Sequence, residues 1–273
     1  MHDVFKDMLP TTKEFEWEQI KHNIRRSSKG LVGSGHGYTM LHAFAAHGND
    51  LAAKLLLDKG ADVDARTNTH SHTPLIVAAY ESCDTTVKLL LENGADIEAK
   101  AENKSTALIY AASSGRDDTV NLLLEKGADV EATDESHCTA LIGAVFSGHE
   151  RVVKLLLGKG ANIEAKSEHG YTSLIIAARN GHLRLVELLL GKGANIEAKD
   201  NKCYTPLIRA AHKGHKRVVE LLLERGADPD AKSNLRMALL GPQMKAIHLA
   251  AGEKAEEIKQ LLRTAALRRR HSL

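Results

Sequence analysis

The chain has 273 residues, of which 43% are hydrophobic and 26% are charged, and its formal net charge is +2. This composition excludes a disordered polar chain, and the nearly balanced charge gives no general attraction to nucleic acid or to an acidic membrane surface. Only 4% of the residues are aromatic, so the core must be built from Leu, Ile, Val and Ala.

The spacing of the cysteines and the lengths of the apolar runs indicate the cellular compartment. Cys83, Cys138 and Cys203 are widely spaced and never form a C-x-x-C pair, which argues against a disulfide framework and against a zinc site. No apolar run approaches the roughly 18 residues of a membrane span, and the opening stretch MHDVFKDMLP lacks the apolar segment of a secretory signal. We therefore expect an intracellular protein, cytoplasmic or nuclear, without a membrane span.

The first 36 residues form a segment of their own. In the stretch TTKEFEWEQIKHNIRR, Thr11 and Glu14 have the spacing of a helix-capping box, and Trp17, Ile20 and Ile24 share one helical face. We expect a helix that covers the first repeat described below. A detached partner-binding segment is the alternative.

From residue 37 onward one pattern repeats. The twelve residues LLLGKGANIEAK occur at 155–166 and again at 188–199. The sequence Gly-Ala-Asp/Asn recurs at intervals of 34, 33, 33, 33 and 33 residues, starting at Gly60, Gly94, Gly127, Gly160, Gly193 and Gly226. A fixed period of this length predicts a stack of structural repeats.

One unit of the repeat shows what each copy is expected to build. In GYTSLIIAARNG, Thr172 caps a short helix and Gly181 ends it. The following HLRLVELLLGKGA predicts a second helix that ends before Gly193. Its apolar residues cover more than one face, as expected of a helix that contacts both its partner helix and the neighbouring repeats. The polar ANIEAKDNKC then suits a projecting loop or hairpin. Identical neighbours provide identical interfaces, so the unit must stack on copies of itself.

This pattern resembles the ankyrin repeat family, whose motif runs G-x-T-P-L-H-x-A-A-x-x-G-H and later G-A-D. The resemblance covers about residues 37–262, or seven repeats. It implies an all-α solenoid of helix-turn-helix units with projecting β-hairpin or loop fingers and a concave surface that binds other proteins. Two departures stand out. The motif His is present at His42 and His248 but is Ile in the five middle repeats, and the family's Asn after Gly-Ala-Asp-Val is an acid here, so asparagine hydroxylation at that position is unsupported.

The C-terminal end is irregular. The distance from Gly193 to Thr205 is 12 residues, whereas that from Gly226 to Lys245 is 19, so residues have been inserted near 235–244. We interpret the insertion as a local cap, with a partner-contacting loop as the alternative. The seventh repeat suits a terminal cap. We interpret the basic tail at 263–273 as a solvated end. The alternatives for this tail are a nuclear import signal or a contact with an acidic partner.

No constellation of residues suggests catalysis. His149, His182 and His215 recur at the same motif position and are therefore interpreted as structural. We expect no catalytic site, no metal, no cofactor and no small-molecule substrate.

The residues that differ between repeats carry the information about a partner. Aromatic side chains at such variable positions often anchor interfaces. The basic residues Arg179, Arg209, His212 and Lys213 of the later repeats suit a partner with an acidic end. For Tyr38, Tyr171 and Tyr204, packing on the next finger is an equal alternative. The candidate partner-binding residues are Tyr38, Tyr80, Tyr110, Phe146, Tyr171, Arg179, Tyr204, Arg209, His212 and Lys213.

The sequence therefore predicts a monomeric, non-enzymatic scaffold or adaptor that binds another protein through the concave groove. Two alternatives stay open: a regulatory inhibitor that masks a partner's surface, and the substrate-targeting arm of a larger enzyme complex. Nucleic acid binding is not favoured.

Overall fold

The structure is a computed structural model that describes residues 32–33, 37–231, 246–252 and 254–271. The expected capping helix around Trp17 and the insertion near 235–244 lie outside these residues. The chain divides into two compact units, residues 1–107 and 108–273, and each is described by itself.

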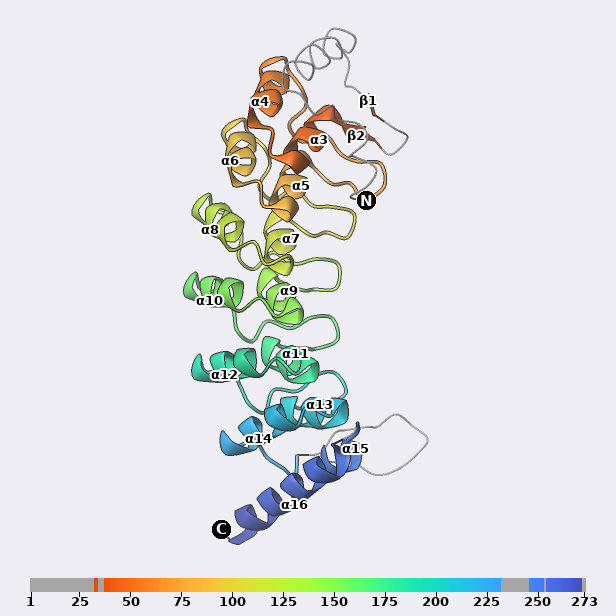
Figure 1. Cartoon of the computed structure of the whole chain (residues 1–273), viewed down its shortest axis with the longest axis vertical. Helices are drawn as coiled ribbons and strands as arrows, with labels where there is room; N and C mark the ends of the chain where they lie inside the picture. The colour runs from red at the N-terminus through yellow and green to blue at the C-terminus, as the bar shows by residue number, and fades with distance from the viewer. Residues whose placement is uncertain (1–31, 34–36, 232–245, 253, 272–273) are drawn as a thin grey trace. The chain divides into compact units, whose positions relative to one another are not determined.

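The first unit contains two helix pairs and a short hairpin. Its strands β1 (Val32–Gly33) and β2 (Tyr38–Thr39) pair in antiparallel fashion, with Val32 opposite Thr39. Helix α3 packs against α4 and α5, and α6 packs against α4 and α5 (Figure 1). The helices are α3 (Met40–His47), α4 (Asp50–Asp58), α5 (Pro74–Glu81) and α6 (Asp84–Glu92).

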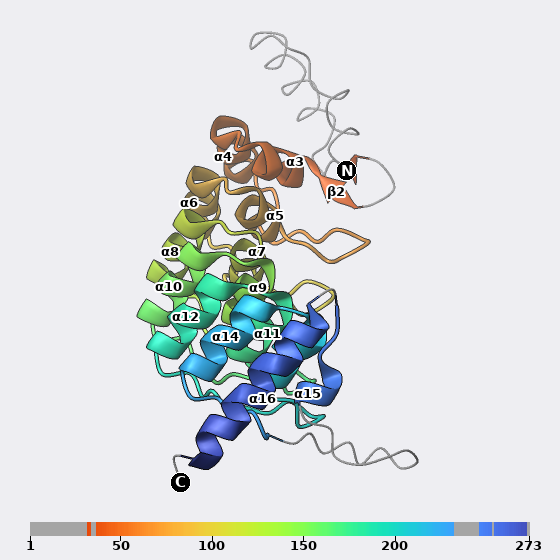
Figure 2. The ribbon, with the colours of Figure 1, turned by 60° about the horizontal axis from the view of Figure 1, so that its bottom comes forward.

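The second unit repeats the same arrangement. First helices pack on first helices, as α11 does on α9 and α13, and second helices pack on second helices, as α12 does on α14 (Figure 2). The helices are α7 (Ala107–Ser113), α8 (Asp117–Glu125), α9 (Ala140–Ser147), α10 (Glu150–Gly158), α11 (Ser173–Asn180), α12 (Leu183–Gly191), α13 (Pro206–Lys213), α14 (Lys216–Glu224), α15 (Ala246–Leu249) and α16 (Ala255–His271). The predicted all-α repeat fold is confirmed, while the number of seven repeats stays a prediction.

The first helices begin and end where the motif predicts. Thr172 Oγ1 accepts the backbone N–H of Ile175 at 3.4 Å, which satisfies one of the donors that the first turn leaves open. Gly181 ends α11 in the left-handed region, at φ +77°, where a side chain would be strained. Equivalent Thr caps begin α3, α5, α9 and α13.

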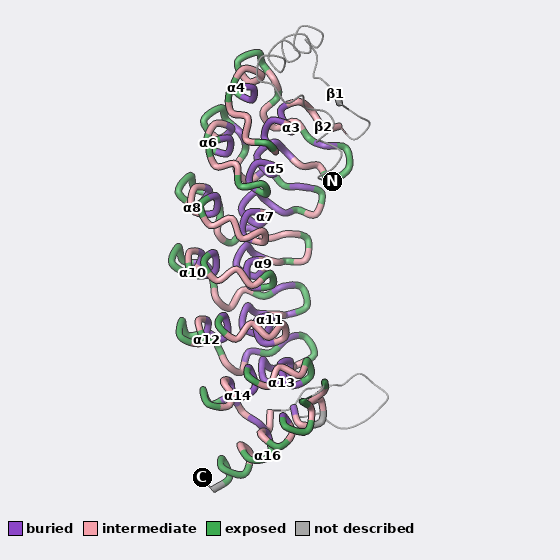
Figure 3. The backbone as a smooth tube through the Cα atoms, in the orientation of Figure 1, coloured by how far each residue is buried: buried purple, intermediate pink, exposed green. Residues whose placement is uncertain are grey.

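The second helices bury one face between the repeats. Leu156 of α10 and Leu189 of α12 are both 0% exposed, as are Val153 and Val186 one turn earlier. In Figure 3 the buried segments of each unit lie along the inner sides of its helix pairs. The core is therefore a row of small aliphatic contacts between neighbouring pairs, as the composition predicts.

The fingers are loops that link neighbouring repeats through their backbones. Glu168 N–H donates to Ser136 O at 2.8 Å, and Asn201 N–H donates to His169 O at 3.1 Å. Each finger is therefore fixed by the finger before it, and its side chains have defined positions.

Helix α16 is longer than the other second helices. It runs for 17 residues without a break through Leu262, where the resemblance ends the seventh repeat. Arg269 pairs with Asp228, and Arg270 lies 3.9 Å from Asp230. The basic tail up to His271 is thus helical, and two of its arginines contact acids of the finger before the insertion.

Candidate functional site

The predicted partner-binding residues are divided between the two units. Tyr38 in β2 and Tyr80 in α5 belong to the first unit. The others belong to the second unit, on α7, α9, α11, α13 and the two fingers that precede α11 and α13: Tyr110, Phe146, Tyr171, Arg179, Tyr204, Arg209, His212 and Lys213. Within the second unit, four of them form one cluster.

That cluster is built around Arg209 of α13. The Arg209 guanidinium lies 4.4 Å from the ring centroid of Tyr204 and 5.1 Å from that of Tyr171, which comes from the preceding repeat. Arg179 of α11 lies 5.7 Å from the same Tyr171 ring. These distances are those of cation–π contacts, so the two finger tyrosines are held by arginines of the first helices.

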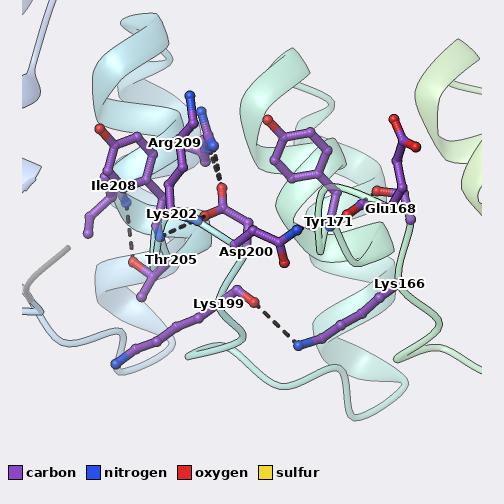
Figure 4. Close-up of polar contacts among 12 residues, drawn as sticks. Lys166, Glu168, Tyr171, Lys199, Asp200, Lys202, Thr205, Ile208 and Arg209 are labelled. Carbon is purple, nitrogen blue, oxygen red and sulfur yellow. Dashed lines mark hydrogen bonds and ion pairs between the residues drawn. The ribbon is translucent and has the colours of Figure 1, made fainter. Parts of the chain in front are cut away.

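A buried carboxylate holds Arg209 in place. Asp200, whose side chain is 0% exposed, accepts a hydrogen bond from Arg209 Nε at 2.8 Å and also pairs with the end of the guanidinium (Figure 4). Its other oxygen accepts the N–H groups of Lys202 at 2.8 Å and Tyr204 at 2.9 Å. One side chain therefore shapes the finger and neutralises Arg209.

This arrangement changes what Arg209 can offer a partner. The residue is 8% exposed, and its charge is already matched by Asp200, so it serves as a support for the rings. Tyr171 and Tyr204 both lie against it, so these two rings contact a first helix. Both tyrosines and the neighbouring Arg179 are half-buried, so the cluster is partly accessible to solvent.

Two aromatic side chains stand out from the surface of their units. Phe146, in the last turn of α9, is 57% exposed, and Tyr80, in the last turn of α5, is 49% exposed. Tyr110 on α7 is half-buried. A phenylalanine exposed to this extent gains free energy when a partner covers it, because apolar area leaves water.

Tyr38, in the first unit, is half-buried and packs beside the motif histidine of its repeat. Its ring centroid lies 5.1 Å from that of His42, and burial, with a contribution from Glu81, raises the pKa of the Tyr38 phenol. His42 accepts the Thr39 backbone N–H and contacts His72 O at 2.9 Å. The motif histidine thus joins two repeats, as the family resemblance implies.

The exposed cations lie at the end of α13. His212 and Lys213 occupy its last turn and are exposed, whereas Arg179 in the last turn of α11 is half-buried. Cations at this end of a helix interact favourably with its dipole. The basic charge predicted for the C-terminal repeats is therefore accessible at His212 and Lys213.

The repeated histidines are structural. His149 contacts Ser113 O at 3.1 Å, His182 contacts Phe146 O at 3.3 Å, and His215 contacts Arg179 O at 2.9 Å. Each imidazole therefore hydrogen-bonds the end of the first helix in the repeat before it, which confirms the structural interpretation.

A set of side-chain hydrogen bonds between neighbouring repeats was not predicted from the sequence. Glu131, Glu164 and Glu197 each accept, at 2.7–2.8 Å, a backbone N–H of the following repeat, from Asn162, Asn195 and Asp228 respectively. The signal was present, because an acid recurs where the family motif has Asn.

The described residues show little that resembles a reactive centre. Burial, together with Asp134 and Glu168, raises the pKa of the Cys138 thiol to about 11, so it is protonated and a poor nucleophile at neutral pH. No group of three or more His, Cys, Asp or Glu side chains in the described ranges is placed to hold a metal ion. None of the helices described is long and apolar enough to cross a membrane.

Comparison with known proteins gives the same picture of the fold. A family model described as ankyrin repeats (3 copies) matches residues 14–101, 97–167 and 141–233. The first match begins inside the segment 1–36. The crystal structure of the human ASB11 ankyrin repeat domain shares 30% sequence identity with this chain, with a TM-score of 0.72 over 81% of this chain and 96% of that one. No curated protein matches the chain.

Proposed function

This chain belongs to the ankyrin repeat family, and we propose on that basis that it is a non-enzymatic scaffold or adaptor that binds a partner protein. Ankyrin repeats are in general protein–protein interaction modules. The proposed contact surface is the side formed by the first helices and the fingers, which the family resemblance places on the concave face.

The observation that supports this proposal most directly is the exposure of Phe146. Residues at repeated positions of the second unit are engaged between repeats, as Glu164, His182 and Leu189 are. Phe146 is instead a large apolar side chain, 57% exposed, at a position that differs between repeats. Stacking does not account for it, whereas a partner that covers it would.

The neighbouring variable residues define the chemistry of the proposed surface. Along the first helices of the second unit, Tyr110 and Phe146 are followed by Arg179. The ring of Tyr171 lies beside Arg179, and the ring of Tyr204 lies beside Arg209. Aromatic and arginine side chains are enriched at interface hot spots, and the aromatic ones bury much area with few rotatable bonds. A partner segment with apolar anchors and an acidic end fits this order.

The test is affinity capture followed by mass spectrometry. The test variant combines Tyr110→Ala, Phe146→Ala and Arg179→Ala. It should not capture the partner, because each truncated anchor costs about 2 kcal/mol or more of binding free energy. Its helical content and melting temperature should stay nearly unchanged. The control combines Arg151→Ala, Arg184→Ala and Leu267→Ala, three exposed residues on second helices and α16, and should capture as the parent does. Undiminished capture by the folded test variant would contradict the proposed surface.

The captured partner also separates the two alternative functions. Purified chain that lowers the activity of a captured enzyme would indicate a masking inhibitor. Purified chain that leaves the enzyme active and delivers a second protein to it would indicate a targeting arm. The three free cysteines suit a reducing, intracellular compartment, which is where we expect the protein to act.

A further inference from the structure

A basic cavity lies near the C-terminal end of the second unit. Its volume is about 410 Å³, and it is lined from the turns between α11 and α12, between α13 and α14, and before α16. Lys213, Lys216, Arg217, Lys254 and His215 line it, and no acid is among the described residues that line it. The cavity is at the end of α13 away from its finger, and its lining residues do not include those of the tyrosine cluster.

Two glycine turns bring its cations together. Gly214 and Gly252 both have positive φ, +77° and +87°. A Cβ on Gly214 would come within 2.7 Å of Ala251 O, and Ala251 N–H donates to Ala211 O at 3.1 Å. Because the two turns touch in this way, Lys213 before the first and Lys254 after the second line one cavity.

The charge of the cavity is largely uncompensated. Lys216 contacts Glu257 at 2.6 Å and Glu220 at 3.8 Å. By contrast, Lys213, Arg217 and Lys254 form no ion pair with any residue in the described ranges, and each of these three side chains is exposed. The carboxylate of Glu257 is held by Lys216. Three cations that have no ion pair with another described residue thus line one cavity.

The same place in earlier repeats carries the opposite charge. The second helices open with Asp50, Asp84, Asp117 and Glu150 in α4, α6, α8 and α10, but with Leu183 in α12 and Lys216 in α14. An acid at this position stabilises the open N–H groups of the first turn. Around α14 that acid is replaced by a lysine, so an external anion would meet both the helix end and the cations.

We propose that this cavity binds the phosphoryl group of a phosphorylated segment in a partner protein. The inference rests on the proposed function and adds the chemistry of one contact. A phosphoryl group carries a charge of about −1.5 to −2 and three acceptor oxygens. Three cations around one site match this better than the single charge of a carboxylate.

The test follows the backbone amides of the ¹⁵N-labelled full chain during titration. The probes are inorganic phosphate and the capped peptides Gly-pSer-Gly, Gly-Ser-Gly and Gly-Glu-Gly. Phosphate and the phosphopeptide should shift the amides of residues 214–218 and Gly252 in a saturable way. The Glu peptide should bind at least tenfold more weakly, and the Ser peptide should cause no shifts there.

Two charge-matched variants decide whether the cavity is responsible. Lys213→Ala, Arg217→Ala and Lys254→Ala combined should weaken phosphopeptide binding at least tenfold. The control removes three exposed lysines at the ends of second helices, Lys126→Ala, Lys159→Ala and Lys192→Ala, and should bind as the parent does. Equal weakening by both variants, equal binding of the Glu peptide, or no shifts in the parent would overturn the proposal.

Capture experiments separate this inference from the proposed function. Capture that survives both phosphatase treatment of the partner and the cavity substitutions would overturn the phosphoryl inference and leave the scaffold proposal intact. Loss of capture on phosphatase treatment and with the cavity variant, but not with the lysine control, would support both.

Discussion

The buried pair of Asp200 and Arg209 gives the sharpest test of how the second unit is built. Asp200→Ser leaves the guanidinium of Arg209 buried beside two rings without its carboxylate. Removing one partner of a buried ion pair costs about 3–5 kcal/mol. We expect a loss of that size, because the Asp200 side chain is 0% exposed and that of Arg209 is 10% exposed.

The preceding repeat supplies the matched partner for this substitution. At the positions equivalent to 200 and 209 it has Ser167 and Ile176, which are 9% and 4% exposed, and Ser167 Oγ accepts the N–H of Tyr171 at 3.3 Å. The double variant Asp200→Ser with Arg209→Ile therefore recreates a pair that the fold already accommodates. Replacing a buried ion pair by packed apolar groups is often neutral or stabilising, so the double variant should recover most of the stability that Asp200→Ser loses.

The assay is a double-mutant cycle. Urea unfolding followed by circular dichroism gives the unfolding free energies, and hydrogen exchange at Lys202 and Tyr204 reports the finger itself, since repeat arrays can unfold in parts. Because Arg209→Ile alone leaves the Asp200 carboxylate buried without its cation, the expected coupling energy is at least about 3 kcal/mol, the upper end of the range for residues in one buried network. Additive effects of the two substitutions, or a cost of Asp200→Ser below about 1 kcal/mol, would refute the assigned role.

Three further predictions follow from other contacts. Leu156→Ala and Leu189→Ala should each cost about 2–5 kcal/mol through lost burial and a cavity, and a urea melt in which either is neutral would contradict the assigned repeat positions. Glu164→Ala should lower the unfolding free energy by about 1 kcal/mol because Asn195 N–H loses its acceptor, whereas Glu164→Gln should lose less; equal losses would argue against this bond. Burial lowers the pKa of His42 below its usual 6.5 despite its bond to His72, so the stability that this residue contributes is present above pH 6.5 and falls as pH decreases below it. His42→Ile should flatten that dependence in thermal melts between pH 7.5 and 5.5, and an unchanged slope would contradict it.

The sequence predicts the repeated parts of this structure well. The helix caps at Thr172 and Gly181 and the burial of Leu189 follow from local rules that apply in every copy. The exposure of Phe146 follows as well, because its position varies between repeats and lies at the end of a first helix. These features need only the period and the chemistry of single residues.

The parts that escaped prediction depend on contacts between non-equivalent positions. The finger turns back at Cys203, whose φ is +57°, as it does at the equivalent His137 and Gly170, so the turn itself is periodic. The pairing of Arg209 with Asp200 is not, because the preceding repeat has Ile176 and Ser167 at those positions. The arginines of the basic tail are exposed, as a solvated end requires, but the ion pair of Arg269 with Asp228 was not predicted, although RTAALRRRH is rich in good helix formers. Only the three-dimensional arrangement brings those charges together.

Variation between repeats therefore has two physical meanings, and the second unit shows both. Asp134 occupies the finger position equivalent to Asp200 and accepts the N–H groups of Ser136 and Cys138, both at 2.8 Å, but the residue equivalent to Arg209 in its repeat is Gly143. An acid in the finger can thus be satisfied by the loop alone, and the arginine exists only where it also supports two rings. A variable residue that has a compensating variable partner, as Arg209 has in Asp200, maintains the fold. A variable residue that has no such partner among the described contacts, as is the case for Phe146 and Lys213, is more simply explained by selection for a binding partner. The binding tests therefore substitute those residues, whereas Arg209 is substituted only in the test of stability.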